Sequence, residues 1–319
     1  MMQDPITYFL SAEVTLSDKL LEVLYFVIGL ICIYTAAANL RDKGNQKRYG
    51  TFVFWLTLGL MFVLGPWIPS LYTGILMCVM VAVPILRQVS RGSQSDPSAE
   101  EAQNNYRKIG MKVFVPALSI GVFALAAALF TSISPLVGMG VGVFVAVIIL
   151  MIYSRDNKPK IFLQDCRRMM DIVGPLSMLP TLLAALGSVF TAAGVGNVIA
   201  QLVSNVIPSG NIVIGIIVYG VGMAVFTMIM GNAFAAITVM TVGIGAPFVL
   251  SLGADPVVVG SLALTCGYCG TLCTPMAANF NMVPVAVLEM KDKNGVIKKQ
   301  VLVGVIMLVL QIIYMIVMC

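Results

Sequence analysis

The chain has 319 residues, of which 59% are hydrophobic and only 10% are charged. Soluble domains carry about 25% charged residues, so this composition excludes an ordinary soluble domain. The net charge of +5 comes from loops between apolar stretches, and the short strands of alternating polarity that a membrane β-barrel needs are absent from the sequence. We therefore predict an all-α polytopic membrane protein, and we expect no nucleic-acid partner.

Many apolar segments approach or exceed the ~20 residues that a helix needs to cross a bilayer. We predict ten transmembrane spans, at residues 20–40, 49–69, 70–87, 110–130, 135–154, 172–193, 194–208, 211–230, 254–289 and 299–319. A re-entrant hairpin is predicted at 231–253. The domains are then an N-terminal five-span scaffold unit (1–154) with a flexible cytoplasmic loop (88–109), an amphipathic connector (155–171) and a C-terminal unit (172–319) that contains the hairpin.

The orientation follows from the basic residues. All but one of the 19 Lys and Arg residues lie in four loops, at residues 41–48, 87–112, 155–168 and 291–299. The positive-inside rule places these loops in the cytoplasm and both termini outside. Segment 194–208 is short, and if it lay in the interface, everything after it would be reversed. The two halves have the pattern of an inverted repeat, but only the second half has a hairpin.

The first break in an apolar stretch is Gly231-Asn232. The half-helix that follows, from Ala233 through Thr238, would direct its positive N-terminal end into the protein, which suits a carboxylate. The alternative is an ordinary Gly-Asn helix cap in a surface loop. Because both flanks are apolar, we favour a substrate site at Gly231, Asn232 and Ala233.

The second break runs from Gly270 to Pro275. Pro275 cannot donate a backbone hydrogen bond and frees carbonyls one turn earlier. Together with nearby hydroxyls and amides, these carbonyls form an oxygen-rich cluster suited to a hard cation. We assign Thr274 and Asn279 to the substrate, and the cation to Thr238, Thr271, Cys273, Pro275 and Asn281. A simple proline kink explains only Pro275.

Residues Cys266, Cys269 and Cys273 form a C-x2-C-x3-C pattern. This spacing defines one helical face, and neither a fourth nearby Cys nor any His accompanies it, so we favour a packing face over a metal or iron–sulfur site. We expect no cofactor and no resident metal. With no His and no acidic pair at membrane depth, we also expect no enzymatic activity.

The order of these motifs resembles the C-terminal repeat of the ion-transporter superfamily. The matching residues are Gly231-Asn232-Ala233 and Cys273-Thr274-Pro275, and Ser177–Leu202 is also similar. In that superfamily a hairpin tip and an unwound Thr-Pro helix form a carboxylate and sodium site. Here the tip lacks the hydroxyls of the usual Ser-Asn-Thr. More narrowly, the whole chain resembles the longer subunit of a two-subunit bacterial transporter family assigned to 5-oxoproline, long described as a domain of unknown function.

This resemblance implies a subunit of a secondary active transporter in the bacterial inner membrane. Its substrate would be a small carboxylate, 5-oxoproline first, carried by elevator-like alternating access with Na⁺ or H⁺ coupling. The implied partners are a second, shorter membrane subunit, which supplies the missing first hairpin, and the lipid bilayer, with higher oligomers as a further expectation. The alternatives are a non-transporting assembly subunit and an intramembrane enzyme.

Overall fold

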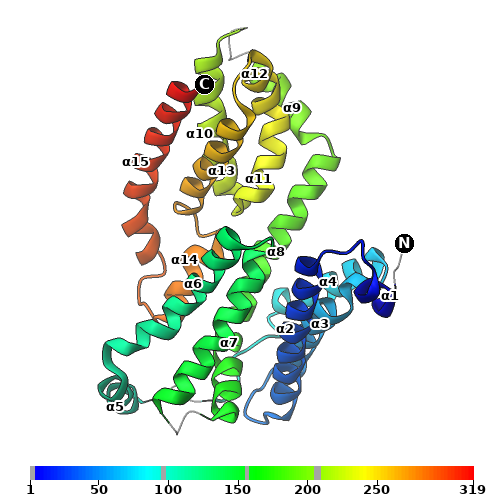
Figure 1. The fold of residues 1–319 in the computed structure, drawn as a ribbon, viewed down its shortest axis with the longest axis vertical. Helices are drawn as coiled ribbons and strands as arrows, with labels where there is room; N and C mark the ends of the chain where they lie inside the picture. Colours follow the sequence, from blue (N-terminus) through cyan, green and yellow to red (C-terminus); the bar gives the residue numbers. More distant parts are fainter. Residues whose placement is uncertain (1–3, 95–97, 155–157, 205–209) are drawn as a thin grey trace. The chain divides into compact units, whose positions relative to one another are not determined.

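The computed structural model describes residues 4–94, 98–154, 158–204 and 210–319, and every regular element in these ranges is a helix. The chain divides into two compact units, Met1–Asp171 and Ile172–Cys319 (Figure 1). The helices of the first unit, the last of which continues into the second, are α1 (Pro5–Leu10), α2 (Leu16–Arg41), α3 (Arg48–Leu64), α4 (Ser70–Ile85), α5 (Ala99–Ile109), α6 (Phe114–Phe130), α7 (Pro135–Tyr153) and α8 (Pro159–Ala192). The second unit adds α9 (Val195–Ser204), α10 (Ile212–Met230), α11 (Ala233–Met240), α12 (Ala246–Phe248), α13 (Pro256–Thr271), α14 (Ala278–Val287) and α15 (Gly295–Met318).

Within the described residues, seven helical segments are long and apolar enough to cross a membrane, and eight if one bent pair counts as a single span. The protein is therefore a helical multi-pass membrane protein, as the composition predicts. Three further apolar helices are shorter: α4, α13 and α14.

In the first unit, neighbouring helices pack in the order α4–α3–α2–α7–α6. Helix α2 begins at a Thr15 cap, whose hydroxyl oxygen accepts the Asp18 N–H at 3.1 Å. Next to it, the Ser134 N–H at the start of α7 donates to Ser17 Oγ at 2.8 Å. The beginnings of α2 and α7 are thus joined, and the two helices pack together.

The second half of the predicted flexible loop 88–109 is a helix in the structure. Helix α5 starts with a capping box in which Ser98 Oγ accepts the Glu101 N–H and the Glu101 carboxylate accepts the Ser98 N–H. These two bonds satisfy N–H groups that a helix start leaves open. The polar composition indicated a linker, but the Ser-x-x-Glu spacing was the stronger signal. Residues 95–97 of this loop lie outside the described residues.

Helix α8 joins two elements that the sequence analysis separated, the connector 155–171 and the span 172–193. After it the chain bends by 66° into α9. The ten residues of α9 rise about 15 Å, which is too short to cross a membrane alone. The predicted span 194–208 is therefore not an independent crossing helix in its described part. Residues 155–157 of the connector and 205–208 of that span lie outside the described residues.

Residues 231–253, predicted as a re-entrant hairpin, do not form two antiparallel arms. A single helical run extends over Ala233–Leu252, through α11, a π-helical turn (Thr241–Gly245), α12 and a final 3₁₀ turn. Pro247 lies inside this run, directly after the π-helical turn, which accommodates the proline ring and its missing N–H. The real hairpin is formed by α10 and α11, with its turn at Gly231-Asn232.

Helices α10, α11, α13 and α15 form the core of the second unit, and Figure 1 shows them side by side. Tyr219, Met223, Ala263, Cys266 and Met315 are fully buried in this core. A Cβ on Gly270 would lie 2.3 Å from the Ala224 carbonyl oxygen, so α10 and α13 touch through the glycine. Cys266 and Cys269 are buried on the same face of α13, which agrees with the packing interpretation of the cysteine pattern.

Candidate functional site

The first break is the tight turn between α10 and α11. Gly231 has a φ of +69° and its N–H donates to the Thr227 carbonyl at 2.6 Å. A Cβ at this position would lie 2.5 Å from the Met276 carbonyl oxygen. Glycine is therefore required twice, once for the left-handed backbone and once for contact with the second break.

Asn232 is the N-cap of α11. Its Oδ1 accepts the N–H groups of Phe234 at 2.9 Å and Ala235 at 3.3 Å. The cap interpretation is confirmed, but the turn is not a surface loop, because Gly231 and Ala233 are both buried. Two of the N–H groups expected to face an anion are thus used by the cap. The Asn232 Nδ2 group has no hydrogen bond to another described residue.

The second break lies between the end of α13 at Thr271 and the start of α14 at Ala278. Thr274 Oγ1 donates to the Met228 carbonyl at 2.9 Å, near the end of α10, and accepts the Met276 N–H at 3.2 Å. One threonine therefore fastens the second break to the helix that leads into the first. The two breaks, more than forty residues apart in sequence, meet in the second unit.

Asn281 holds the second break closed. Its side chain is fully buried, and its Nδ2 donates to the carbonyls of Thr271 and Thr274, both at 2.7 Å. These are the carbonyls that a cation was expected to use, and the amide already satisfies them. In the described part of the chain, Asn281 Oδ1 and Thr227 Oγ1 are buried without a hydrogen-bond partner.

The other predicted residues have mixed surroundings. Asn279 and Pro275 are exposed. Two side chains bond backbone carbonyls of their own helix, Thr271 to Tyr268 at 2.6 Å and Thr238 to Ala235 at 3.0 Å, and Cys273, just after α13, bonds the Cys269 carbonyl at 3.4 Å.

An open hollow of about 510 Å³ lies beside Asn232, between α8 and α11. Its polar lining residues are Ser188, Thr191, Asn232 and Thr238, and the Thr191 and Thr238 hydroxyls are 3.4 Å apart. The structure thus brings Asn232 and Thr238 to one place. Ser188 and Thr191 escaped the sequence analysis. Their spacing of three residues, which puts both on one face of an apolar helix, is the signal that marks them.

A second feature absent from the sequence analysis is a buried charged cluster in the first unit. Arg167 pairs with Asp42 at 2.8 Å and lies 3.8 Å from Asp171, and all three side chains are at most 10% exposed. Asp171 Oδ1 accepts bonds from Asn39 Nδ2 at 2.9 Å and Trp55 Nε1 at 3.0 Å. The cluster therefore joins α2, α3 and α8 at the end of the first unit where the basic loops lie.

Hydrogen bonds keep the Asp42 carboxyl group ionised. Burial by itself raises the pKa of this carboxyl, but bonds from the Ser93 hydroxyl and N–H, from Arg167 and from the Gly44 N–H outweigh it and lower the pKa to about 2. Asp42 is thus ionised at neutral pH and holds the segment around Ser93 against the turn after α2.

An all-helical chain with several membrane-crossing helices and two interlocked breaks belongs to the broad class of multi-pass membrane proteins. More particularly, residues 22–319 match the model of a family described as protein of unknown function (DUF979), and the chain belongs to that family. Searches of curated proteins and of solved structures gave no match.

Proposed function

We propose that this chain is a subunit of a secondary active transporter for a small carboxylate, with 5-oxoproline as the first candidate. The observation that carries the proposal is the contact between the two breaks, Gly231 against Met276 and Thr274 against Met228. Interrupted apolar segments whose backbone is covered by protein are a pointer to a transporter binding site. The resemblance of the same two motifs to ion-transporter repeats supports this reading.

The carboxylate would bind in the hollow between α8 and α11. Asn232 Nδ2 and the Ser188 hydroxyl offer donors in that hollow, whereas the Thr191 and Thr238 hydroxyls already donate to the Gly187 and Ala235 carbonyls. The N-terminal end of α11 adds a partial positive charge that the Asn232 cap shares. Thr274 and Asn279, which were assigned to the substrate, do not line this hollow. Thr274 instead holds the two breaks together through its bond to the Met228 carbonyl. The lactam ring of 5-oxoproline would lie against Phe234.

The coupling cation, Na⁺ or H⁺, would act at the second break. Two buried oxygen atoms without a hydrogen-bond partner are Asn281 Oδ1, on the helix that follows the second break, and Thr227 Oγ1, on α10 one turn before the first break. Oxygen atoms of this kind are the ligands that a hard cation takes in broken helices. Closing and opening of the Asn281 bonds to Thr271 and Thr274 would then link cation binding to the shape of the break.

The proposed topology has ten crossings and both termini outside the cytoplasm of a bacterial inner membrane. Relative to the sequence prediction, α8 and α9 together replace the two spans 172–193 and 194–208 with one crossing. Ala233–Leu252 replaces the predicted hairpin with one additional crossing. The two changes cancel, so the basic loop 291–299 stays on the cytoplasmic side. The α10–α11 hairpin and the broken pair α13–α14 would form the moving part of an elevator-like carrier.

A shorter membrane subunit is the proposed partner and would complete the site. The alternative, a non-transporting assembly subunit, is favoured by one observation. The hydrogen-bonding groups at both breaks are largely used within the chain, through the Asn232 cap and the Asn281 amide. In that case the breaks would serve packing against the partner.

Ligand-dependent thermal stabilisation distinguishes a transporter subunit from an assembly subunit. The purified protein, alone and with the shorter subunit, is heated with 5-oxoproline or with 2-pyrrolidinone, the same ring without the carboxylate. A saturating ligand at about 100 times its Kd adds roughly 2.7 kcal/mol, so the unfolding temperature should rise by a few degrees with 5-oxoproline only.

The matched variants are Asn232→Asp and Asn232→Ser. Asp and Ser cap helices about as well as Asn, so both should fold, but Asp would repel a carboxylate. We expect the ligand effect to vanish in Asn232→Asp and to persist, weakened, in Asn232→Ser. An equal response to the two ligands, or an unchanged response in Asn232→Asp, would favour the assembly role.

A further inference from the structure

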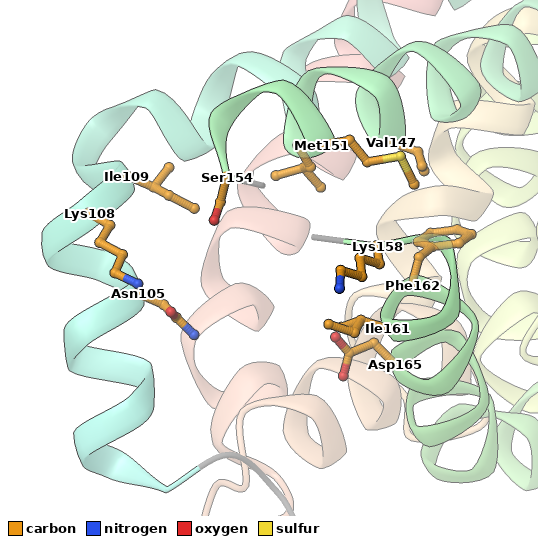
Figure 2. A pocket seen from close by; sticks show the side chains of 11 residues that line it. Asn105, Lys108, Ile109, Val147, Met151, Ser154, Lys158, Ile161, Phe162 and Asp165 are labelled. Atoms are coloured by element: carbon orange, nitrogen blue, oxygen red, sulfur yellow. The ribbon is translucent and has the colours of Figure 1, made fainter. Parts of the chain in front are cut away.

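The first unit contains two pockets of similar volume whose linings differ in charge. The lining of the pocket of about 460 Å³ where α5 and α7 end and α8 begins includes Lys108, Lys158 and Asp165, so side chains of both signs meet there (Figure 2). The other pocket, of about 430 Å³ between α1, α2 and the end of α3, has one charged lining residue, Glu22. Small-molecule sites have volumes of about 300–1,000 Å³. This second pocket, the Glu22 pocket, therefore has the size of a ligand site and a single acidic group.

Four of the nine residues that line the Glu22 pocket are aromatic: Phe9, Phe26, Phe62 and Trp67. The Trp67 ring is held by its neighbours, because its centroid lies 5.3 Å from that of Tyr8, edge to face, and 6.3 Å from that of Phe9. The face of an aromatic ring carries partial negative charge, and tryptophan attracts a cation most strongly. These walls thus favour a ligand that is both apolar and positively charged.

The Glu22 carboxylate has no partner of opposite charge. Among the described residues it makes no hydrogen bond and no ion pair, and the charged group that acts on it is Asp18, another carboxylate. Lys19, the one basic residue among the first 40, donates its ammonium group to the Ser11 carbonyl at 2.8 Å. An ionised side chain within a membrane-crossing helix is costly and normally has a partner. A positively charged ligand would supply it.

The end of the first unit that holds the Glu22 pocket is acidic. Helix α2 starts beside the pocket and runs to Arg41, at the basic loop of the opposite end. Residues 1–40 contain four acidic side chains and one lysine, an excess of three negative charges, and residues 1–3, which lie outside the described ranges, are Met-Met-Gln. The positive-inside rule places this end outside the cytoplasm. Negative charge around an entrance raises the local concentration of cations there.

We propose that the Glu22 pocket binds an amphipathic organic ammonium ion from outside the cytoplasm. The ammonium group would pair with the Glu22 carboxylate and lie over the face of Trp67. The apolar part of the ligand would lie against Phe26 and Phe62, which line the same pocket from α2 and α3. Binding here is independent of what the second unit transports.

Two other cations fit the pocket less well. A zwitterionic phospholipid would bring its phosphate close to Asp18 and Glu22, and the ammonium group of Lys19, which could offset that phosphate, is bound to Ser11. An inorganic cation would leave the aromatic walls without a contact, and the single carboxylate offers it few oxygen ligands. The lining therefore selects an organic cation without an anionic group.

Calorimetric titration of the detergent-purified full chain tests the proposal. The probes are benzyltrimethylammonium and neopentylbenzene, which has the same skeleton with carbon in place of the charged nitrogen. We expect the ammonium ion to bind at least about tenfold more tightly, because only it can pair with Glu22. The chain has two tryptophans, and Trp55 is buried at 3% exposure, so a change in tryptophan fluorescence on binding should come from Trp67.

The matched variants are Glu22→Gln and Glu13→Gln. The first removes the carboxylate from the pocket, and the second removes the same charge from an exposed residue at the same end. We expect Glu22→Gln to weaken binding of the ammonium probe at least about tenfold and Glu13→Gln to change it less than about twofold. Because Glu22 has no partner in the chain, Glu22→Gln should unfold at a temperature no lower than the wild type does. Trp67→Leu should weaken the ammonium probe roughly two- to thirtyfold.

Equal binding of the two probes, or full affinity for the ammonium probe in Glu22→Gln, would overturn the proposal. Loss of probe binding in nanodiscs of phosphatidylethanolamine, but not in nanodiscs of phosphatidylglycerol, would show that a lipid headgroup occupies the pocket instead. An uncharged extension before Met1 should leave the affinity unchanged. If it strengthened binding, the pocket would belong to the terminal ammonium group of the chain and not to a separate ligand.

Discussion

Two ion pairs in this chain have the same nitrogen-to-oxygen distance and opposite surroundings. Arg167 and Asp42 lie 2.8 Å apart with side chains 10% and 8% exposed, whereas Lys298 and Asp292 lie 2.8 Å apart with side chains 66% and 50% exposed. Water screens the second pair and not the first. Removing one partner of a buried pair leaves an uncompensated charge, while an exposed pair contributes little.

We predict that Asp42→Asn lowers the free energy of unfolding by roughly 2–3 kcal/mol, somewhat below the usual cost because Asp171 still faces Arg167. Asp292→Asn is the matched control and should cost less than about 1 kcal/mol. Thermal or denaturant unfolding of both variants in the same detergent measures the difference. Equal losses would mean that the Arg167 cluster is not buried as described.

The lowered pKa of Asp42 gives the same pair a pH signature. Its folded pKa of about 2 lies below the ordinary value of 3.8, so ionised Asp42 stabilises the fold at neutral pH. That contribution is lost as the pH falls from about 4 through about 2. Asp42→Asn should therefore lack this part of the acid-induced loss of stability.

Gly231 tests the contact between the breaks. Gly231→Ala adds a Cβ 2.5 Å from the Met276 oxygen at a φ of +69°, whereas Gly253→Ala adds one at a φ of +99° with no atom within 4 Å. The left-handed backbone alone costs roughly 1–2 kcal/mol, so Gly253→Ala should lose that amount and Gly231→Ala distinctly more. A comparison of their unfolding temperatures isolates the clash. Similar losses would show that the two breaks do not touch.

At the scale of elements, α13 and α14 are one apolar segment interrupted by six residues. Asn281 bonds the two carbonyls at the interruption, whereas the neighbouring Asn279 is exposed. We predict that Asn281→Ala costs roughly 2–4 kcal/mol because it leaves two buried carbonyls without partners, and that Asn279→Ala changes stability by less than about 0.5 kcal/mol. Unfolding curves of the two variants decide this. If Asn279→Ala cost as much, the break would be arranged differently.

Local sequence signals predicted some elements and misled on others. The Asp255-Pro256 pair is a local signal for a helix start, and α13 begins there, because Asp255 Oδ1 accepts the N–H groups of Val257 and Val258. The Ser98-x-x-Glu101 spacing predicts a helix start, but the sequence analysis considered only the polar composition of this segment and predicted a linker. Pro247 indicated a break that a π-helical turn absorbs. A proline restricts only its own turn, and the sequence does not say whether the helix stops or adapts.

The candidate site was harder to predict than the helices. Gly231 and Asn232 were found because an amide between apolar flanks is costly without a role. Ser188 and Thr191 were missed because each is unremarkable alone, and only the packing of α8 on α11 brings them to Asn232. The Asp42–Arg167–Asp171 cluster was missed for the same reason. Its members are 125 and 4 residues apart, and the longer separation has no local signature.

At the scale of the whole molecule, composition alone predicted a helical membrane protein. A helical chain with only 10% charged residues and many long apolar stretches does not form an ordinary water-soluble domain. The path of the chain through the membrane depended on two short segments, 194–208 and 231–253. Each differs from its prediction: α9 is too short to cross a membrane alone, and Ala233–Leu252 forms one helical run.

The central claim is that the hollow beside Asn232 binds a small carboxylate for transport. The most direct measurement is uptake of labelled 5-oxoproline by vesicles that contain this chain and the shorter subunit, with and without a Na⁺ gradient and with Asn232→Asp as the matched variant. We predict uptake in the wild type, driven by Na⁺ if that is the coupling ion, and none in Asn232→Asp. Absence of uptake under every condition by folded protein, or equal uptake by Asn232→Asp, would contradict the claim.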